Sequence, residues 1–296
     1  MIVYIDTHKM EPPIFSIKDD FKSYLDEHGY VVIGDIMKEN NLIDKFWSAW
    51  TQCSLKFKRD DMSTWTIENT PMMFAKGMAV FSGLAHSDFM WDVRLNKNIR
   101  KIFAKVHGTK DLISSFDGFS VFFTHKQKTK PWLHVDLNPS NPLYGVQGQY
   151  NFLPVREDSS GFIVVPGSHR TNVDSSTNRD WVLVGEHPDA VKLIIPENCF
   201  TLWNSRMLHA NTGMTSKQVR LDRLTCYVTY LPRSYRTSES VFEHKVKAYE
   251  NGDGTSHWAN RCEIKKYPWG FGPRYESHGF HRIKPGELTD ERLLII

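Results

Sequence analysis

Short β-favouring runs separated by turn residues follow one another from about residue 111 to residue 232. The runs are rich in Val, Ile, Thr, Tyr and Phe, while Gly, Pro, Asn and Asp stand between them. Strands of this length and spacing favour a sandwich or a jelly-roll barrel over alternating strand–helix–strand units. The expected strands are 116–123, 132–136, 144–155, 161–166, 190–196, 199–205 and 223–232.

The first 110 residues show a pattern typical of helices, interrupted by one expected buried strand at 30–36. Apolar side chains at helical spacing predict a helix over about 38–58 and a longer one over 86–108. Gly108 is expected to close the longer helix, because glycine adopts the left-handed conformation that ends many helices. We therefore expect a mainly β core with flanking helices.

The chain after residue 232 is polar and aromatic without clear periodicity. We expect this extension to be ordered, because so many aromatic side chains would be costly to leave in water. Together with the irregular loop at 60–85 it is the expected lid, since variable loops supply specificity around a fixed barrel. The expected organisation is a single domain, 1–296, with a helical N-terminal segment (1–110), a β core (111–232) and an extension (233–296).

Charge and composition exclude several classes of protein. Lysine and arginine number 37 against 34 acidic residues, and a net charge of +3 is too small to predict a nucleic-acid-binding surface. No run approaches the roughly 18 apolar residues that a membrane span needs, and the N-terminus lacks the pattern of a secretory signal. The four cysteines are far apart, which favours reduced thiols over disulfides. We expect a cytoplasmic protein whose partner is a small molecule.

A His and an Asp two residues apart occur at three places, and their contexts differ. The pair at 86–88 stands at a predicted helix start, where Ser or Asp caps free backbone amides. The pair at 187–189 encloses a proline in a predicted turn. Each of these two has a sufficient structural explanation. The third pair, at 134–136, lies in an expected strand.

His134 and Asp136 project from one face of that strand, because residues i and i+2 of a strand point the same way. His209 follows the apolar run CFTLW, and a barrel can return the chain so that it lies beside the first pair. Two histidines and one carboxylate on one face form the facial triad of non-haem Fe(II) oxygenases. Three protein ligands leave positions open for a bidentate cosubstrate and dioxygen, whereas a structural zinc site would have a fourth protein ligand.

An arginine on a later strand adds a second constraint. In RLTCYVTYLP, Arg223 and Thr225 share one face, where a guanidinium fork and a hydroxyl would form a receptor for a buried carboxylate. Arg220 is the alternative three residues earlier and is expected to face the opposite way. A simpler explanation for either arginine is that it lies on the surface at the start of a strand and binds no ligand. Another expected strand has one polar face that lines either a pocket or the solvent: Gln147, Gln149 and Asn151.

The order of these motifs resembles a known family. Its elements are LHVD (133–136), GFIVVPGSHR (161–170), LWNSRMLHANTG (202–213) and the arginine-led strand. They are similar to the phytanoyl-CoA dioxygenase-like branch of Fe(II)/2-oxoglutarate oxygenases, of which PGSH is far more characteristic than H-x-D alone. The resemblance covers about residues 75–232, and some of it is similar to a subgroup with no settled substrate. It implies a double-stranded β-helix core (jelly-roll, cupin-like) with helices packed on one side.

This resemblance implies an enzyme that binds Fe(II) and uses 2-oxoglutarate and O2 to hydroxylate a small molecule, with release of succinate and CO2. The implied metal ligands and catalytic residues are His134, Asp136 and His209. An arginine of the last core strand would hold the C5 carboxylate of 2-oxoglutarate. The implied cosubstrate contacts are Arg223 or Arg220, Thr225, Gln149, Asn211 (where relatives often have Ser or Thr) and Tyr150 (near an aromatic residue of the family's pocket).

Three alternatives to this enzyme are open on the sequence alone. A related halogenase would lack the carboxylate ligand that Asp136 supplies. A catalytically silent β-barrel binding protein would keep the scaffold without turnover. A cupin-like metal enzyme independent of 2-oxoglutarate would not need the arginine, so that Arg223→Ala would leave its activity unchanged.

Overall fold

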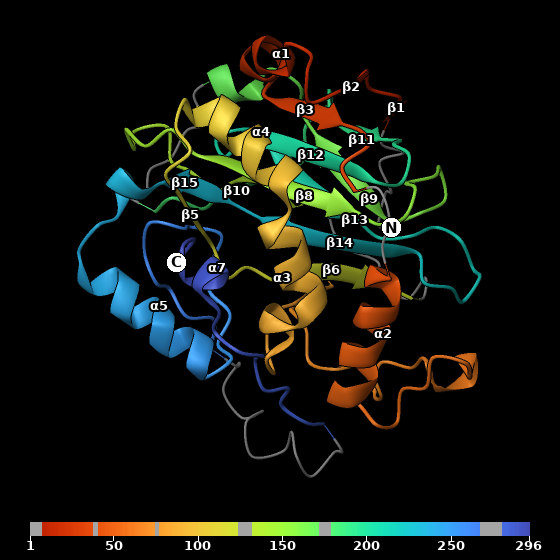
Figure 1. Ribbon diagram of the computed structural model, residues 1–296. Coiled ribbons are helices and arrows are strands. Elements are labelled where there is room, and N and C mark those ends of the chain that lie inside the picture. The colour runs from red at the N-terminus through yellow and green to blue at the C-terminus, as the bar shows by residue number, and fades with distance from the viewer. Residues whose placement is uncertain (1–7, 38–40, 75–76, 124–131, 172–178, 267–279) are drawn as a thin grey trace.

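Two β-sheets lie face to face, and helices cover the outer face of the larger sheet (Figure 1). This computed structural model describes residues 8–37, 41–74, 77–123, 132–171, 179–266 and 280–296. The arrangement is the double-stranded β-helix with flanking helices that was expected, so the predicted fold class is confirmed. The four cysteines are reduced thiols, as expected. Within the described ranges, no helix combines the length and the hydropathy needed to cross a membrane.

The smaller sheet has the strand order β1-β11-β9-β13-β7-β10. Its pairs are antiparallel except for β1, which runs parallel to β11. The strands are β1 (His8–Met10), β7 (Leu133–Val135), β9 (Gly161–Val164), β10 (Val182–Gly185), β11 (Val191–Leu193) and β13 (His209–Thr212). Two of them, β10 and β13, have no clear signature in the sequence, because β10 is a largely exposed edge strand and β13 reads HANT.

The larger sheet has the order β2-β3-β12-β8-β14-β6-β4. The strands are β2 (Ile14–Phe15), β3 (Tyr30–Ile33), β4 (Met78–Ala79), β6 (Phe119–Phe122), β8 (Val146–Asn151), β12 (Cys199–Asn204) and β14 (Arg223–Val228). The expected strand 223–232 is divided, because its end forms β15 (Tyr230–Pro232), which pairs with β5 (Leu112–Ser114) in a separate small sheet. Strands from the first 110 residues complete both large sheets, so the β structure extends beyond 111–232.

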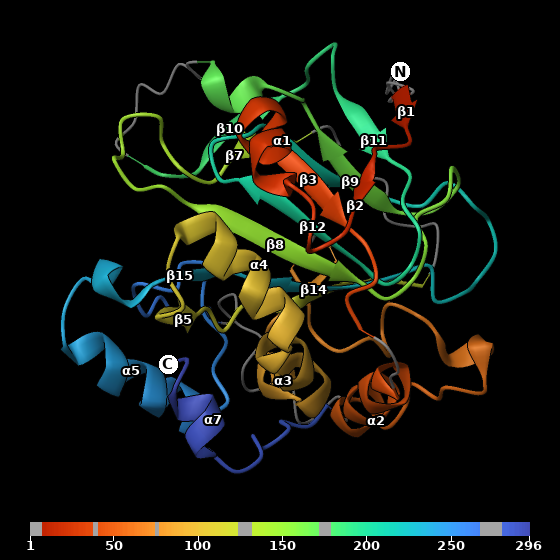
Figure 2. The same ribbon diagram turned by 45° about the horizontal axis from the view of Figure 1, so that its top comes forward.

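The helices α1 to α4 lie on one side of the larger sheet, and α5 and α7 lie together near the C-terminus (Figure 2). Their bounds are α1 (Phe21–His28), α2 (Leu42–Cys53), α3 (Asp88–Leu95), α4 (Lys97–His107), α5 (Ser240–Glu250) and α7 (Asp290–Leu293). Short 3-10 turns are η1 (Met62–Thr64), η2 (Leu84–His86), η3 (Ser168–Arg170) and η4 (Arg233–Tyr235). The predicted helix 38–58 is shorter than expected, and residues 38–40 lie outside the described residues.

The single helix predicted over 86–108 is wrong, because the chain breaks at Asn96 into α3 and α4. Asn96 has φ −57° and ψ 123°, which is outside the helical region. Its side-chain oxygen accepts hydrogen bonds from the backbone N–H groups of Asn98 (2.9 Å) and Ile99 (3.1 Å). Asn96 is therefore the N-cap of α4, and Gly108 ends that helix with φ 69° as predicted.

Replacing this cap tests the break directly. Asn96→Ala removes the acceptor for two free N–H groups and should lower the free energy of unfolding by about 1 kcal/mol. Denaturant unfolding monitored by circular dichroism measures the change. Asn96→Asp keeps an accepting oxygen and should retain most of the stability, so equal losses in the two variants would contradict the capping role.

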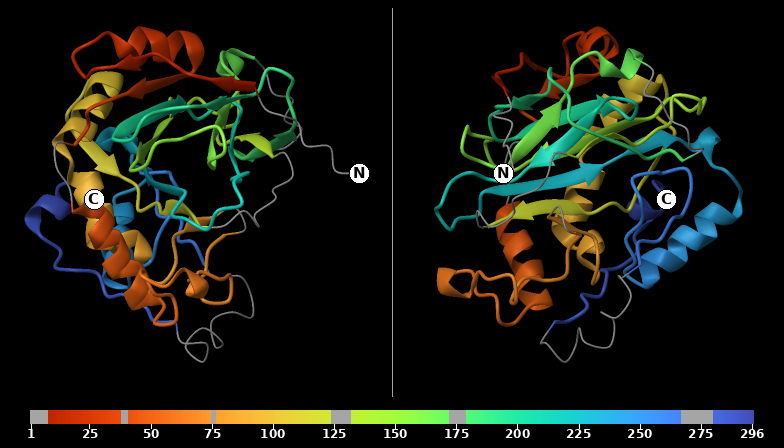
Figure 3. Two further views of the ribbon diagram at one scale, coloured as in Figure 1. Left: turned by 90° about the vertical axis from the view of Figure 1, so that its right-hand side faces the viewer. Right: turned by 180° about the vertical axis from the view of Figure 1, so that it is seen from behind.

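The larger sheet separates two environments. On β14, Leu224, Cys226 and Val228 belong to the main hydrophobic core beneath the helices. Alternate residues of a strand point to opposite faces, so Arg223 and Thr225 point into the space between the sheets. The segment 41–74 (orange) and the described parts of the C-terminal extension, 233–266 and 280–296 (blue), lie at the same end of these sheets (Figure 3). The scaffold thus presents polar side chains between the sheets and loop-rich segments at one end.

Candidate metal centre and active-site cavity

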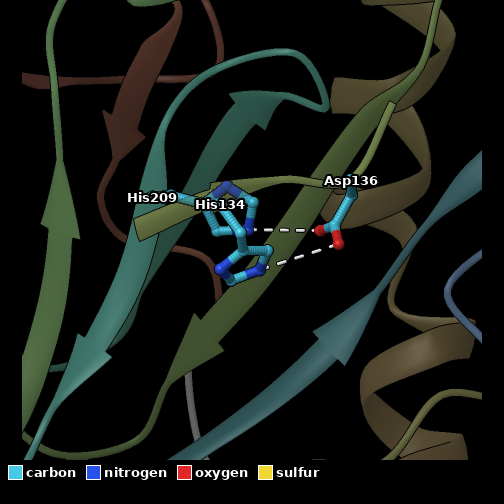
Figure 4. A group of neighbouring side chains, drawn as sticks. All are labelled: His134, Asp136 and His209. Carbon is cyan, nitrogen blue, oxygen red and sulfur yellow. Dashed lines mark ion pairs between the residues drawn. The ribbon is translucent and has the colours of Figure 1, made fainter. Parts of the chain in front are cut away.

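Strand pairing brings the two expected ligand segments together. His134 lies on β7, Asp136 follows that strand directly, and His209 begins β13. β7 and β13 are antiparallel neighbours, with His209 opposite His134 in the register. The three side chains are buried and point toward one another, as Figure 4 shows.

The ligand atoms lie at distances that suit a single metal ion. Nε2 of His134 is 3.6 Å from Oδ1 of Asp136, and Nε2 of His209 is 3.2 Å from Oδ2 of the same carboxylate. One ligand atom from each residue lies within 4.8 Å of the other two. Two histidines and one carboxylate in this arrangement have the composition of a facial triad.

Backbone carbonyl groups orient both imidazole rings. Nδ1 of His134 is 3.0 Å from the carbonyl oxygen of Trp132, and Nδ1 of His209 is 2.9 Å from that of Met207. A carbonyl oxygen only accepts, so each Nδ1 carries the proton and donates it. Each Nε2 is then unprotonated, and its lone pair points toward the other members of the triad. This is the tautomer that a metal ligand needs.

Burial and neighbouring charges shift the pKa values of His134 and Asp136 toward the protonation states that bind a cation. Burial is the main cause that lowers the pKa of His134 to about 4, with the nearby His209 acting in the same direction. Burial alone would raise the pKa of Asp136, but His257 and the two triad histidines outweigh it and hold that pKa well below its usual range. Gln147 also donates to Oδ2 of Asp136 (2.9 Å). A neutral His134 imidazole beside the ionised carboxylate of Asp136 is the state that binds a metal ion.

The other two H-x-D pairs lie elsewhere and have structural roles. His86 is buried, and its Nε2 lies 2.9 Å from the carbonyl oxygen of Asp253. His187 and Asp189 belong to an exposed turn, where the backbone N–H of Asp189 donates to Nδ1 of His187. Neither pair has a second histidine in place, and the only His/Cys/Asp/Glu group suited to a metal among the described residues is the triad.

Two buried histidines outside the triad predict a loss of stability in mild acid. Burial lowers the pKa of His86 to about 3 and that of His107 to about 4, against 6.5 for an ordinary histidine. Between about pH 4 and 6.5 the unfolded chain therefore binds protons that the folded chain excludes. The free energy of unfolding should fall as the pH falls through this window, by roughly 1.4 kcal/mol per pH unit for each histidine.

The measurement is urea unfolding of the metal-free protein across that pH window. His107 lies 3.0 Å from the carbonyl oxygen of Tyr230, and His107→Gln keeps a donor there without titrating. This variant should lose less stability on acidification than the wild type. His187→Gln, in the exposed turn, is the matched control and should follow the wild type. Identical slopes for His107→Gln and the wild type would contradict the prediction.

Arg223 lies inside the barrel without a carboxylate partner among the described residues. It is 2% exposed, and Nη2 donates to Oε1 of Gln149 (3.1 Å) and to Oδ1 of Asn211 (2.9 Å). Nε and Nη1 are buried and have no hydrogen-bond partner. A buried guanidinium with unused donors is costly unless a ligand completes it, and the geometry of its fork fits a carboxylate.

Arg220 occupies a different environment. Its Nη2 lies 2.8 Å from Oδ1 of Asp222 and 3.0 Å from Oδ1 of Asp158, and its side chain is partly exposed. Both carboxylates neutralise it, so it has no free charge to offer a ligand. Of the two candidate arginines, only Arg223 faces the space between the sheets.

Further polar side chains surround Arg223 on the inner face of the larger sheet. Thr225 pairs with Asn151 in the strand register, and Gln149 pairs with Thr201. Buried polar atoms without a hydrogen-bond partner gather here: Nε2 of Gln149, Oδ1 of Asn151, Oγ1 of Thr201 and Oγ1 of Thr225. Unsatisfied buried polar atoms are rare in folded proteins, so their concentration beside Arg223 indicates a binding site for a polar ligand.

Tyr150, which the family resemblance placed near the cosubstrate pocket, lies on the opposite side of the sheet from Arg223. Gln147, Gln149 and Asn151 occupy one face of β8, and strand alternation places Tyr150 on the other face. Its ring packs in the core beneath the helices, and its hydroxyl donates to Oδ1 of Asn198 (3.0 Å).

A cavity of about 770 Å³ opens beside the triad. Its lining includes Asn211 and Tyr227, which are joined by a hydrogen bond of 2.7 Å. Residues that were not predicted from the sequence also line it: Asp117, Trp132, Trp181, His257 and Trp258. Of these, only Trp132 has a local signal, because it stands two residues before His134 on the same side of the strand. Its ring stacks on that imidazole at 4.6 Å between centroids.

Comparison with known proteins agrees with the motifs and the triad. No protein-family model matches the chain. The chain is 26% identical to "Ava biosynthesis cluster protein O" of Aspergillus versicolor, over 83% of its own length and 89% of that protein. It is 21% identical to a Dictyostelium discoideum protein named "Putative phytanoyl-CoA dioxygenase", over 83% of its length and 82% of that protein. At these levels of identity both proteins are distant relatives of the chain.

Two solved structures show that the chain shares its fold with the epimerase SnoN and with EvdO2. The epimerase SnoN, solved with Fe3+, alpha ketoglutarate and nogalamycin RO, superposes with a TM-score of 0.50 at 14% identity, covering 72% of the chain and 82% of SnoN. EvdO2 of Micromonospora carbonacea superposes with a TM-score of 0.51 at 14% identity, covering 75% and 92%. The chain thus combines the fold of these proteins with a buried His–Asp–His triad that could hold a metal ion, as in non-haem Fe/2-oxoglutarate oxygenases.

Proposed function

We propose that the protein binds Fe(II) and 2-oxoglutarate and hydroxylates a small organic molecule, with release of succinate and CO2. The observation that carries this proposal is the presence, in one barrel, of the buried His134/Asp136/His209 triad and the unpaired Arg223 guanidinium. A binding protein without turnover would have no need for both features. A metal enzyme independent of 2-oxoglutarate would have no need for the arginine.

In this proposal the triad residues hold Fe(II) through two Nε2 atoms and the carboxylate of Asp136. When bound, the iron supplies the activation of dioxygen, one atom of which enters succinate while the other enters a C–H bond of the substrate. Gln147, through its hydrogen bond of 2.9 Å to Asp136, holds the carboxylate in position. Such support by neighbouring side chains raises metal affinity and fixes ligand geometry.

Arg223 would hold the distal carboxylate of 2-oxoglutarate through its unused donors. Asn211 and Gln149 already accept from Nη2, which orients the guanidinium plane and leaves Nε and Nη1 for the cosubstrate. Thr225, whose hydroxyl has no partner, adds a further donor on the same strand face. Asn211 thus serves where relatives often have Ser or Thr, because its amide connects Arg223 to Tyr227.

The relatives favour a natural product as the substrate. SnoN was solved with nogalamycin RO, and the Aspergillus versicolor relative is named for a biosynthesis cluster. The cavity volume of about 770 Å³ lies in the range that encloses a ligand of drug-like size.

The experiment is a metabolite screen scored by succinate release from the Fe(II)-loaded protein. We expect substrate-stimulated succinate formation by the wild type and none by His134→Ala. Mass spectrometry of the reacting metabolite should show a gain of one oxygen atom. Succinate formation that is equal in the two proteins would refute the proposal.

A further inference from the structure

A second buried acidic group, Asp117, lies in the cavity wall outside the triad. It belongs to the loop between β5 and β6 and is 4% exposed. Oδ1 accepts a hydrogen bond from the N–H of Gly118 (2.8 Å). Its other oxygen has no hydrogen-bond or ion-pair partner among the described residues. A carboxyl group this deeply buried normally has several partners, so Asp117 lacks some of the hydrogen bonds that it could accept.

The protein holds Asp117 rigidly in this position. The buried Arg94 donates from Nη2 to the carbonyl oxygen of Asp117 (2.5 Å) and from Nη1 to that of Ala85 (2.7 Å). A Cβ atom on Gly118 would lie 2.1 Å from the carbonyl oxygen of Ala79, so only glycine permits this close packing of the loop. The guanidinium of Arg94 binds the backbone of Asp117 and does not bind its carboxyl group, so the Asp117 carboxyl group is available to a ligand in the cavity.

The C-terminal extension is joined to this loop and adds a second polar group. The N–H of Thr255 donates to the carbonyl oxygen of Phe116 (2.9 Å), and the N–H of Phe116 donates to Oγ1 of Thr255 (3.1 Å). Two residues farther along, His257 lines the cavity, and its Nε2 is buried without a hydrogen-bond partner. His257 affects the pKa of both Asp117 and Asp136, so its ring lies within electrostatic reach of both carboxyl groups.

Two basic side chains in the cavity wall already contact other groups. Arg261 pairs with Asp180 (3.2 Å) and with Glu263 (2.8 Å). The ammonium group of Lys265 lies 5.9 Å from the ring centre of Phe74, in a cation–π position. Asp117 is the acidic lining residue without a direct ion pair among the described residues. Burial raises the pKa of its carboxyl group and outweighs the nearby His257, Lys265 and Arg94, which act in the opposite direction. Its charged form is therefore poorly stabilised until a ligand supplies a positive partner.

Aromatic rings occupy much of the remaining wall. Trp132, Trp181 and Trp258 line the cavity together with Phe74. A cavity that combines aromatic faces with one unpaired carboxylate suits an organic cation, because rings attract cationic groups and the carboxylate binds N–H donors. An anionic ligand would meet the unpaired Asp117 and be repelled.

We propose that the substrate of this site carries a protonated nitrogen, which Asp117 binds, and an apolar ring, which the tryptophans hold beside the triad. The proposal identifies the substrate class and rests on the proposed function for the reaction itself. The ring nitrogen of His257 offers a second hydrogen bond to the same polar end of the substrate. Asp117 thereby acts as a specificity-determining residue.

The test compares two ring compounds of similar size and opposite charge, 2-phenylethylamine and 3-phenylpropionate. Isothermal titration calorimetry measures their binding to the full-length chain loaded with Mn(II) and 2-oxoglutarate. We expect the amine to bind at least about tenfold more tightly, in keeping with one charge-assisted hydrogen bond. Asp117→Asn keeps the acceptor for Gly118 and should abolish this preference. Asp189→Asn, on the exposed turn, is the matched control and should retain it.

Several results would overturn the inference: equal binding of the two compounds, tighter binding of the acid, binding of neither, or a preference that persists in Asp117→Asn. Mn(II) binding, followed by electron paramagnetic resonance in the same samples, reports on the metal site separately. A protein that binds no Mn(II) but prefers the amine through Asp117 would refute the proposed function and keep this inference. Normal binding of the metal and 2-oxoglutarate without the amine preference would refute this inference and leave the proposed function standing.

Discussion

His134→Ala will remove both metal binding and substrate-dependent succinate release. The imidazole supplies one of only three protein ligands, and no other histidine, cysteine or acidic side chain among the described residues is grouped with the triad. Loss of even an outer-shell partner typically lowers metal affinity or activity about 10- to 100-fold. Loss of a ligand itself should exceed that, so we expect at least about a 100-fold decrease in turnover.

The chain contains a matched control for this variant. His187 belongs to a second H-x-D pair, but it lies in an exposed turn. His187→Ala should retain wild-type iron content and activity, which shows that the effect depends on the site and not on the motif. Iron titration and succinate release measure the two properties separately. A His134→Ala protein with full activity and full metal content would refute the assignment of the triad.

Strand alternation made much of this site predictable. It correctly separates Arg223 and Thr225 from Leu224 and Cys226 on β14, since the first pair lies inside the barrel and the second lies in the core. The same rule places Tyr150 on the outer face of the larger sheet, although the family resemblance suggested a position in the cosubstrate pocket. The period of a strand is a local property, and it determines the side of the sheet more reliably than proximity in sequence to a family motif.

The residues that alternation did not predict come from loops and from distant segments. Asp117 lies in a loop whose position depends on Arg94 and on the extension at Thr255. Contacts between segments so far apart are set by tertiary packing and have no local signature.

The break between α3 and α4 was missed for a different reason. Apolar spacing continues across Asn96, and only the cap geometry shows that the helix restarts there.

Arg223→Met will raise the KM for 2-oxoglutarate and leave metal binding intact. Methionine fills a similar volume without a charge, so the buried site stays packed while the guanidinium donors are lost. A hydrogen bond to a charged group contributes about 1.5–3 kcal/mol, which corresponds to an increase of roughly 10- to 150-fold. Arg223→Lys keeps the charge but not the planar fork, so its KM should lie between those of the wild type and Arg223→Met.

Arg220→Met is the matched control, because this arginine precedes the same strand but pairs with Asp158 and Asp222. Its KM for 2-oxoglutarate should remain close to the wild-type value. Initial rates of succinate release at varied 2-oxoglutarate concentration measure all three variants. A raised KM in Arg220→Met with none in Arg223→Met would exchange the roles of the two arginines. Full activity of Arg223→Met without added 2-oxoglutarate would instead favour the cupin-like metal enzyme, because that enzyme needs the triad but not a receptor for the cosubstrate's carboxylate.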